Sequence, residues 1–332
     1  MSQTWKKTYN DTPLVYPAST EEVSEVLKIC HVKRIPVTSY SSETSLERHY
    51  TPTYGGISVK FSRMDKVLAV HHQDIDVVVQ PAVQWQKLNE DLKNDNLFFP
   101  PDPGPGAMIG GMLAAIELLD DNQMEYLNHF VGESGVKRNK APTLFLKFGG
   151  TPDAVREQVK IVEKLASKAG SLSFDFARDK KQEANLWSSR RDALWATMSV
   201  MKEGDKVLTS DVAVPISRLP DAIEQAKAHI TALGLVGSIV GHAGDSNFHT
   251  IAVYSKEQRA QAEDFLHAMV DRALEMEGTC TGEHGVGLGK RDAVVKELGE
   301  DTVAAMRRIK LVFDPLCLLN CDKIFKSQKD NI

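Results

Sequence analysis

The chain has 332 residues, of which 42% are hydrophobic and 26% are charged, a composition typical of a folded globular protein of about two domains. Its 40 Lys and Arg against 45 Asp and Glu give a net charge of -5, so it lacks the basic surplus of a nucleic-acid-binding protein. The most apolar stretch, residues 109–119, is far shorter than the roughly 20 residues that a membrane-spanning helix needs, so we expect no transmembrane segment.

The first hundred residues predict short strands and amphipathic helices. Residues 19–34 carry an apolar helical stripe behind a capping Ser19 or Thr20. Residues 98–111 are dense in Pro and Gly, which excludes a helix or a central strand and predicts a loop. The remaining predicted elements of this part are strands at 35–37, 56–61 and 67–79 and a helix at 84–92.

Beyond a boundary near residues 112–116, the order of strands and helices predicts an α+β fold in which helices cover one face of a mainly antiparallel sheet. Strands are predicted at 143–148, 171–177, 207–214, 236–241 and 248–254. Helices are predicted at 152–170, 181–201, 217–233, 255–277 and over most of 291–313.

The sequence GHAGDSNFH at 241–249 predicts a β-hairpin with a histidine on each strand. If residues 244–247 form the turn, His242 faces His249 directly, with β-carbons ~5 Å apart. Two neutral imidazoles so placed suit a metal ion such as Zn, Mn or Fe, and two histidines alone do not identify which. The alternative is that they are two ordinary sheet histidines beside a turn.

The glycine-rich sequence GTCTGEHGVGLGK at 278–290 predicts a tightly bent loop that carries a carboxylate and an imidazole. Its spacing does not fit the phosphate-binding Walker or dinucleotide patterns. Taken with the hairpin, Glu283 completes a two-histidine, one-carboxylate metal site with His242 and His249, which leaves His284 as a base near the metal.

A third candidate is the helical sequence LWSSRRDALW at 186–195, where twin arginines lie between two tryptophans. Arginine binds carboxylates through two parallel hydrogen bonds, so Arg190 and Arg191 are candidates for such a contact. The alternative is a solvated helical face beside core tryptophans.

With these motifs the chain resembles the FAD-linked α-hydroxy acid dehydrogenases of the vanillyl-alcohol-oxidase type, and among them the cytochrome-dependent D-lactate dehydrogenases. Besides the three motifs above, the likeness rests on TSLERH at 44–49, GGISVKFSRMDKVL at 55–68, DIDVVVQPAV at 74–83, FFPPDPG at 98–104, IGGM at 109–112 and TSDVAVPISRLP at 209–220.

The resemblance implies a PCMH-type (p-cresol-methylhydroxylase-type) FAD-binding domain over residues 1–113 and an α+β cap domain over 114–332, with an antiparallel sheet and C-terminal helices. It implies that His242, His249 and Glu283 hold a divalent metal, that His284 is the catalytic base and that Arg190 binds the substrate carboxylate. It places the FAD contacts at Thr44, Ser45, Pro101, Asp102, Gly104, Ile109, Gly110 and Gly111.

The implied reaction is oxidation of D-lactate, with electrons passed from the flavin to cytochrome c. Thr209 stands where hydroxyglutarate-type relatives carry lysine, which favours a small monocarboxylate over D-2-hydroxyglutarate; glycolate is a further alternative. The relatives imply a mitochondrial location. The residues alone indicate a cytoplasmic protein or a missing targeting segment, since the first 17 residues fit neither a signal peptide nor a transit peptide.

The chain departs from the family pattern in two ways. Ser41, Glu43, Arg48 and Ser246 stand where the family has glycine. In addition, IGGM runs almost directly into a segment that resembles the cap, so part of the FAD domain and the first part of the cap are missing. These departures motivate a second hypothesis, a non-catalytic metal-binding relative.

Overall fold

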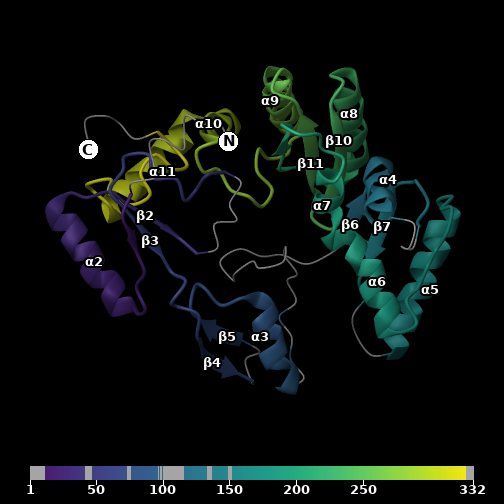
Figure 1. The fold of residues 1–332 in the computed structure, drawn as a ribbon, viewed down its shortest axis with the longest axis horizontal. Coiled ribbons are helices and arrows are strands. Elements are labelled where there is room, and N and C mark those ends of the chain that lie inside the picture. The colour runs from purple at the N-terminus through teal and green to yellow at the C-terminus, as the bar shows by residue number, and fades with distance from the viewer. Residues whose placement is uncertain are drawn as a thin grey trace. The chain divides into compact units, whose positions relative to one another are not determined.

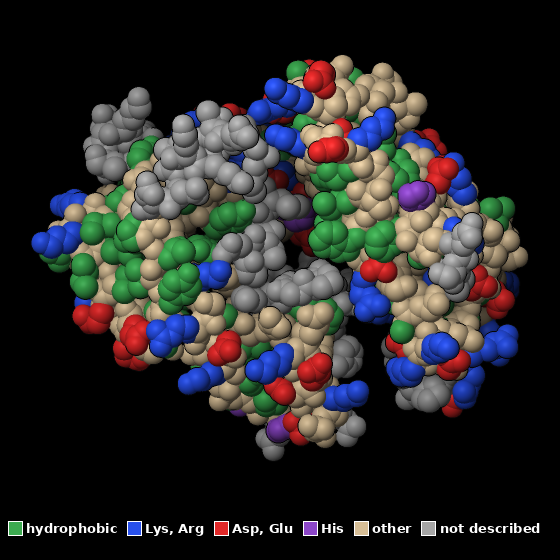
Figure 2. Space-filling view, in the orientation of Figure 1, with side chains coloured by type: hydrophobic (Ala, Val, Ile, Leu, Met, Phe, Trp, Pro, Cys, Tyr) green, Lys and Arg blue, Asp and Glu red, His purple; other side chains and the backbone are tan. Residues whose placement is uncertain are grey.

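The computed structural model describes residues 12–41, 47–72, 76–95, 97, 99, 116–132, 137–148 and 152–326. The chain divides into two compact units: unit 1 comprises Met1–Ala114 with Thr279–Ile332, and unit 2 comprises Ala115–Gly278. Within the described ranges, no helix combines the length and the apolar character needed to cross a bilayer. On the face drawn in Figure 2, the described Lys and Arg side chains are interspersed with Asp and Glu.

Unit 1 contains a small parallel sheet covered by one helix. The strands lie in the order β1–β3–β2, with β1 at Leu14–Val15, β2 at Val37–Tyr40 and β3 at Ile57–Lys60. Helix α2 (Thr20–Lys33) packs Cys30 against the buried valines of β2 and β3. The Ser19 side chain accepts a hydrogen bond from Glu22 N at 3.2 Å, so the predicted helix and its cap are confirmed.

The predicted strand at 67–79 is a hairpin. Strands β4 (Val67–His71) and β5 (Asp76–Val79) pair antiparallel, and helix α3 (Trp85–Leu92) packs against their valines before a short 3-10 turn, η1 (Lys93–Asp95). The helix prediction is confirmed. The single-strand prediction is wrong, because β4 ends at His71, β5 begins at Asp76, and the two strands pair with each other.

The carboxyl-terminal segment packs in unit 1. It contains α10 (Arg291–Leu298) and α11 (Glu300–Phe313), as predicted. Beyond them, Val37 N donates to Leu318 O at 2.6 Å, and Asn320 N donates to Val37 O at 2.8 Å. Residues 279–332 therefore belong to unit 1, and the range 114–332 does not form one compact unit. The sequence does not predict this division, because hydrogen bonds between such distant segments leave no local pattern.

Unit 2 contains a six-stranded antiparallel sheet in the order β7–β6–β10–β11–β8, with β9 also paired to β11. The strands are β6 (Ile116–Leu119), β7 (Thr143–Leu146), β8 (Lys206–Thr209), β9 (Val212–Ala213), β10 (Val236–His242) and β11 (Asn247–Tyr254). The helices are α4 (Asp121–Phe130), α5 (Pro152–Lys168), α6 (Lys180–Arg191), α7 (Ala193–Met198), η2 (Ile216–Arg218), α8 (Leu219–Ala232) and α9 (Arg259–Glu275).

Helices cover both faces of this sheet (Figure 1). On one face α8 and α9 enclose a cluster around Phe248, and on the other α4 and α7 pack against Val240. The prediction that helices cover only one face is wrong, because β10 and β11 are apolar on both sides and need a partner on each. His242 follows Val240 by two residues and therefore lies on the α4 and α7 face.

Three predicted elements of unit 2 differ from the structure. Residues 171–177 form no strand, and Leu172 is 79% exposed, so the alternation of apolar residues there has no sheet to face. The helix predicted at 181–201 breaks at Asp192. The strand predicted at 207–214 is interrupted at Ser210, whose Oγ accepts a hydrogen bond from Thr250 N at 2.8 Å.

Asp120 makes the stability of unit 2 depend on pH. Its carboxylate caps α4 by accepting a hydrogen bond from Gln123 N at 2.8 Å, and the residue is only 2% exposed. Burial raises the pKa of Asp120 to about 6, against the opposing effect of that hydrogen bond. Because the folded pKa lies above the unfolded one, this group stabilises the fold fully below about pH 4, and that contribution is lost as the pH rises through 6.

We predict that Asp120→Asn raises the free energy of unfolding at pH 8 by up to roughly 3 kcal/mol and changes it little at pH 4. Asparagine still caps the helix, while the buried charge is removed. Urea denaturation at both pH values measures the difference. Asp179→Asn is the control, because Asp179 caps α6 in the same way but is exposed. An effect of Asp120→Asn that is equal at pH 4 and pH 8 would contradict the prediction.

Candidate active site

The turn of the β10–β11 hairpin comprises residues 243–246, one position earlier than predicted. His242 pairs with Asn247, and His249 pairs with Val240. The two histidines are therefore diagonal neighbours on one face of the sheet rather than directly opposed. Their ring centroids are 5.5 Å apart, at an interplanar angle of 86°.

Hydrogen bonds fix the same tautomer in both histidines. His242 Nδ1 lies 2.8 Å from Glu117 Oε1, and His249 Nδ1 lies 3.1 Å from Ser210 O. A carboxylate and a carbonyl can only accept, so both Nδ1 atoms donate. In each neutral ring the lone pair is then on Nε2, which is the nitrogen that can ligate a metal.

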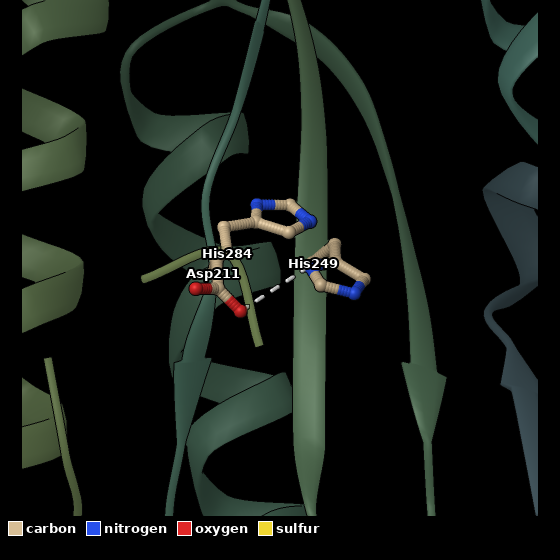
Figure 3. A group of neighbouring side chains, drawn as sticks. All are labelled: Asp211, His249 and His284. Carbon is tan, nitrogen blue, oxygen red and sulfur yellow. Dashed lines mark ion pairs between the residues drawn. The ribbon is translucent and has the colours of Figure 1, made fainter. Parts of the chain in front are cut away.

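Asp211 adds a buried negative charge beside His249. It is 1% exposed, and its Oδ1 lies 3.9 Å from His249 Nδ1, as the dashed line in Figure 3 shows. This distance is too long for a hydrogen bond, so the contact is electrostatic. Asp211 lies in the interruption between β8 and β9 and was not among the predicted site residues, because the pattern at 207–214 predicts one continuous strand.

Glu117 connects His242 to Arg190. Glu117 lies on β6 directly opposite His242, and its Oε2 accepts a hydrogen bond from Arg190 Nε on α6. Burial acts to raise the pKa of Glu117, but the hydrogen bond from His242 and the charge of Arg190 outweigh it and lower that pKa. Glu117 is therefore a buried carboxylate in an ion pair, and none of the sequence motifs pointed to it.

The two tryptophans beside Arg190 differ: Trp187 is partly buried against the core cluster that contains Val240, whereas Trp195 is exposed. The Trp187 ring lies against Lys147, whose Nζ is 3.8 Å from the ring centroid, and Trp195 is 55% exposed. Arg191 is exposed, whereas the Arg190 side chain is 25% exposed. Of the twin arginines, only Arg190 is held in place by a buried carboxylate.

The glycine-rich loop of unit 1 packs closely on residues 47–49. Leu288 N donates to Glu47 O at 2.9 Å, and His49 Nε2 donates to His284 O at 3.0 Å. Gly287 has a φ of +49°, and a Cβ there would lie 2.0 Å from Glu47 O, so only glycine fits. Within this loop, His284 Nε2 lies 3.7 Å from Glu283 Oε1.

The structure thus groups His242, His249 and Arg190 within unit 2, and Glu283 with His284 within unit 1. The predicted metal site draws on both units and stays a prediction. The predicted FAD contacts lie outside the described residues: Thr44, Ser45, Pro101, Asp102, Gly104, Ile109, Gly110 and Gly111.

Two family comparisons cover almost the whole chain. Residues 107–324 match the family described as FAD linked oxidases, C-terminal domain, and residues 12–116 match the family described as FAD binding domain. The chain belongs to the FAD-linked oxidase family. It is therefore a flavoprotein oxidoreductase by family, and the match at 12–116 supports FAD as its cofactor.

Curated relatives of this FAD-linked oxidase include two proteins named D-lactate dehydrogenase [cytochrome], mitochondrial. The one from Kluyveromyces lactis is 36% identical and the one from Arabidopsis thaliana 33% identical; each comparison covers 94% of this chain and 73% of the relative. The alignment with the first runs over 422 positions, whereas 94% of 332 residues is about 312. Roughly 110 aligned positions therefore have no residue in this FAD-linked oxidase, as expected for a missing segment.

Solved structures confirm the PCMH-type fold. A 4-ethylphenol oxidase from Gulosibacter chungangensis in complex with isoeugenol superposes with a TM-score of 0.65 at 11% identity, covering 96% of this chain and 90% of that one. A p-cresol methylhydroxylase with substrate bound gives 0.61 at 14% identity, covering 94% and 88%. At such identities the likeness shows the fold alone.

Two of the residues expected to stand in place of family glycines adopt the left-handed conformation that glycine favours. Arg48 has a φ of 61°, and Ser246, in the turn between the two histidines, has a φ of 63°. An L-residue costs roughly 1–2 kcal/mol in this conformation, whereas glycine adopts it without steric cost. The fold of this FAD-linked oxidase thus keeps the glycine-type backbone without the glycine.

We predict that Ser246→Gly stabilises unit 2 by roughly 0.5–1 kcal/mol, which is the relief of strain less the greater entropy of an unfolded glycine. Thermal unfolding of the two proteins measures the change. Ser217→Gly, in the 3-10 turn η2 with ordinary φ, is the control and is expected to destabilise. A lower unfolding temperature for Ser246→Gly would contradict the prediction.

Proposed function

We propose that this FAD-linked oxidase oxidises a small D-2-hydroxy acid, and that its substrate is D-lactate, which becomes pyruvate. The observation that carries the proposal is the pair of tautomer-fixed histidines, one of which shares the buried Glu117 with Arg190. A 2-hydroxy acid presents a hydroxyl and a carboxylate, for which a metal and a guanidinium are the matching groups. Three relatives at 33–36% identity bear the name D-lactate dehydrogenase [cytochrome].

His242, His249 and Glu283 are the residues proposed to hold a divalent metal, Zn or Mn. Imidazole and carboxylate ligands suit both ions. A buried acceptor in unit 2 also fits a cation: Asn247 lies opposite His242, and its Oδ1 has no hydrogen-bond partner within the described part of the chain. When bound, the metal supplies positive charge that lowers the pKa of the substrate hydroxyl.

The FAD contacts are proposed at Thr44, Ser45 and the loop residues within 101–111 named above. Strand β2 fits this role, because its carboxyl end at Tyr40 shortly precedes residues 44 and 45 in the sequence. Ligands of open parallel sheets bind beyond the carboxyl ends of the strands. When bound, FAD supplies the acceptor for the hydride that leaves the substrate α-carbon.

Two side chains of this protein would act on the substrate directly. Arg190 uses Nε for Glu117, and its Nη atoms are the donors proposed to bind the substrate carboxylate. His284 is proposed to accept the hydroxyl proton as general base. The alcohol thus loses a proton to His284 and a hydride from carbon, which leaves the ketone.

Thr209 favours a monocarboxylate substrate. It ends β8 opposite Ile251, a position where a lysine would supply the second cation that a dicarboxylate such as D-2-hydroxyglutarate requires. We infer from the names of the relatives that a cytochrome accepts the electrons and that the protein is mitochondrial. The family resemblance suggests cytochrome c as this acceptor.

The test is turnover by the purified protein. We expect a yellow protein with the absorbance of oxidised flavin that reduces cytochrome c with D-lactate faster than with glycolate or D-2-hydroxyglutarate. Dialysis against a chelator is expected to abolish turnover while the flavin stays bound, and added Mn²⁺ or Zn²⁺ is expected to restore it. A flavin-loaded protein that is inactive with all three acids would refute the proposal.

The roughly 110 missing aligned positions favour a second candidate, a metal-binding relative without catalytic activity. It predicts one bound metal per chain and no flavin. Metal analysis and flavin extraction on the same sample separate the two functions.

A further inference from the structure

Glu117 joins two residues of unit 2 to which the proposed function gives different tasks. It lies on β6, whereas His242 lies on β10 and Arg190 on α6. Its Oε1 is 2.8 Å from His242 Nδ1, and its Oε2 accepts from Arg190 Nε. The residue is 3% exposed, so water does not compete for either oxygen.

Each of these two bonds determines which atoms the partner presents. A carboxylate that accepts from Nδ1 fixes the lone pair of His242 on Nε2. A carboxylate that accepts from Nε anchors the guanidinium of Arg190, whose Nη atoms are further donors on the same rigid plane. One buried side chain therefore sets both a tautomer and an orientation.

We propose that Glu117 is a positioning residue that holds His242 in its metal-binding tautomer and Arg190 in its carboxylate-binding orientation. This inference rests on the proposed function and deepens it. Glu117 couples the metal ligand to the substrate contact, so one substitution affects the binding of both. If the ion pair only stabilised the fold, its loss would not selectively weaken metal binding or substrate binding.

The nearly isosteric substitution Glu117→Gln separates these roles. Arginine has no acceptor, so the glutamine must turn its Oε1 toward Arg190 and its NH₂ group toward His242. Nδ1 of His242 must then accept, and its proton moves to Nε2. That tautomer cannot ligate through Nε2 until the proton is displaced.

The experiment compares the flavin-loaded full chain of wild type, Glu117→Gln and Asp120→Asn. Asp120 is the matched control, because it is an equally buried carboxylate three residues away that caps α4 and contacts neither His242 nor Arg190. Calorimetric titration with Mn²⁺ measures metal affinity. The ¹⁵N shifts of labelled histidines in metal-free protein report the tautomer of His242, whose signals are assigned by their loss in His242→Gln.

We expect Glu117→Gln to weaken Mn²⁺ binding 10- to 100-fold, to exchange the ¹⁵N shifts of the two nitrogens of His242 and to raise the KM for D-lactate. Asp120→Asn is expected to match wild type in all three. Unchanged shifts in Glu117→Gln, or an equal loss of affinity in Asp120→Asn, would overturn the inference. If the wild type binds no divalent metal, the metal part of the proposed function fails, and the tautomer of His242 alone decides the role of Glu117.

Discussion

Arg190→Met is expected to lower the free energy of unfolding by roughly 2–5 kcal/mol, because it leaves the buried carboxylate of Glu117 without its cationic partner. The same change is expected to raise the KM for D-lactate about 10- to 100-fold, which is the loss of a charge-assisted hydrogen bond to the substrate. Methionine retains most of the length of the side chain, so packing changes little. Urea denaturation and steady-state kinetics measure the two effects.

The neighbouring Arg191→Met is the matched control. Arg191 occupies the next position of α6 but is exposed, so both effects are expected to be small. The double variant Arg190→Met/Glu117→Gln separates stability from substrate binding. It removes the charge that Arg190→Met leaves unpaired, so its free energy of unfolding is expected to return most of the way to the wild-type value. The KM for D-lactate is expected to stay high. Recovery of the KM as well would show that Arg190 has no contact with the substrate.

The hairpin illustrates what local sequence patterns can and cannot determine. Turn residues between apolar strands predicted its existence and the common face of the two histidines. The register was predicted one residue too late, because Ser246 adopts a left-handed φ that the turn needs and that its residue type does not favour. The structure therefore makes His242 and His249 diagonal rather than opposed, which still leaves their rings 5.5 Å apart.

Glu117 shows why the rest of the site was beyond prediction. Its sequence context, a glutamate inside a short apolar strand, is a signal in itself, since an unpaired carboxylate is rarely buried. Its partners, however, are 73 and 125 residues away in the chain. Such a contact depends on the strand order β6–β10 and on the packing of α6, and neither leaves a periodic trace.

The same reasoning explains the errors in the fold. Residues 171–177 alternate like a strand, yet no neighbouring strand pairs with them in the described part of unit 2. Conversely, residues 318–320 lack a strand pattern and still bond to Val37. Local periodicity identified most helices, because a helix makes its own hydrogen bonds, whereas a strand requires a partner that the pattern does not name.

His284→Ala is expected to lower kcat by about 10²- to 10⁴-fold, the usual contribution of a positioned general base. The loop that carries His284 is held through its own backbone atoms: the His49 side chain donates to the carbonyl of residue 284, and Leu288 N donates to Glu47 O. Removal of the imidazole therefore leaves the loop in place. Flavin content, metal content and the unfolding temperature are expected to stay at wild-type values.

The control for His284→Ala is His267→Ala, which removes an exposed imidazole from α9 and is expected to leave kcat unchanged. Imidazole added to the medium can enter the space that the alanine leaves and accept the hydroxyl proton, so it is expected to restore part of the turnover of His284→Ala. Rescue must saturate with imidazole concentration, since a general effect of buffer on the enzyme would appear in His267→Ala as well. Two results would contradict the role of His284 as the base. One is a wild-type kcat in His284→Ala, and the other is a loss of turnover that missing flavin explains entirely.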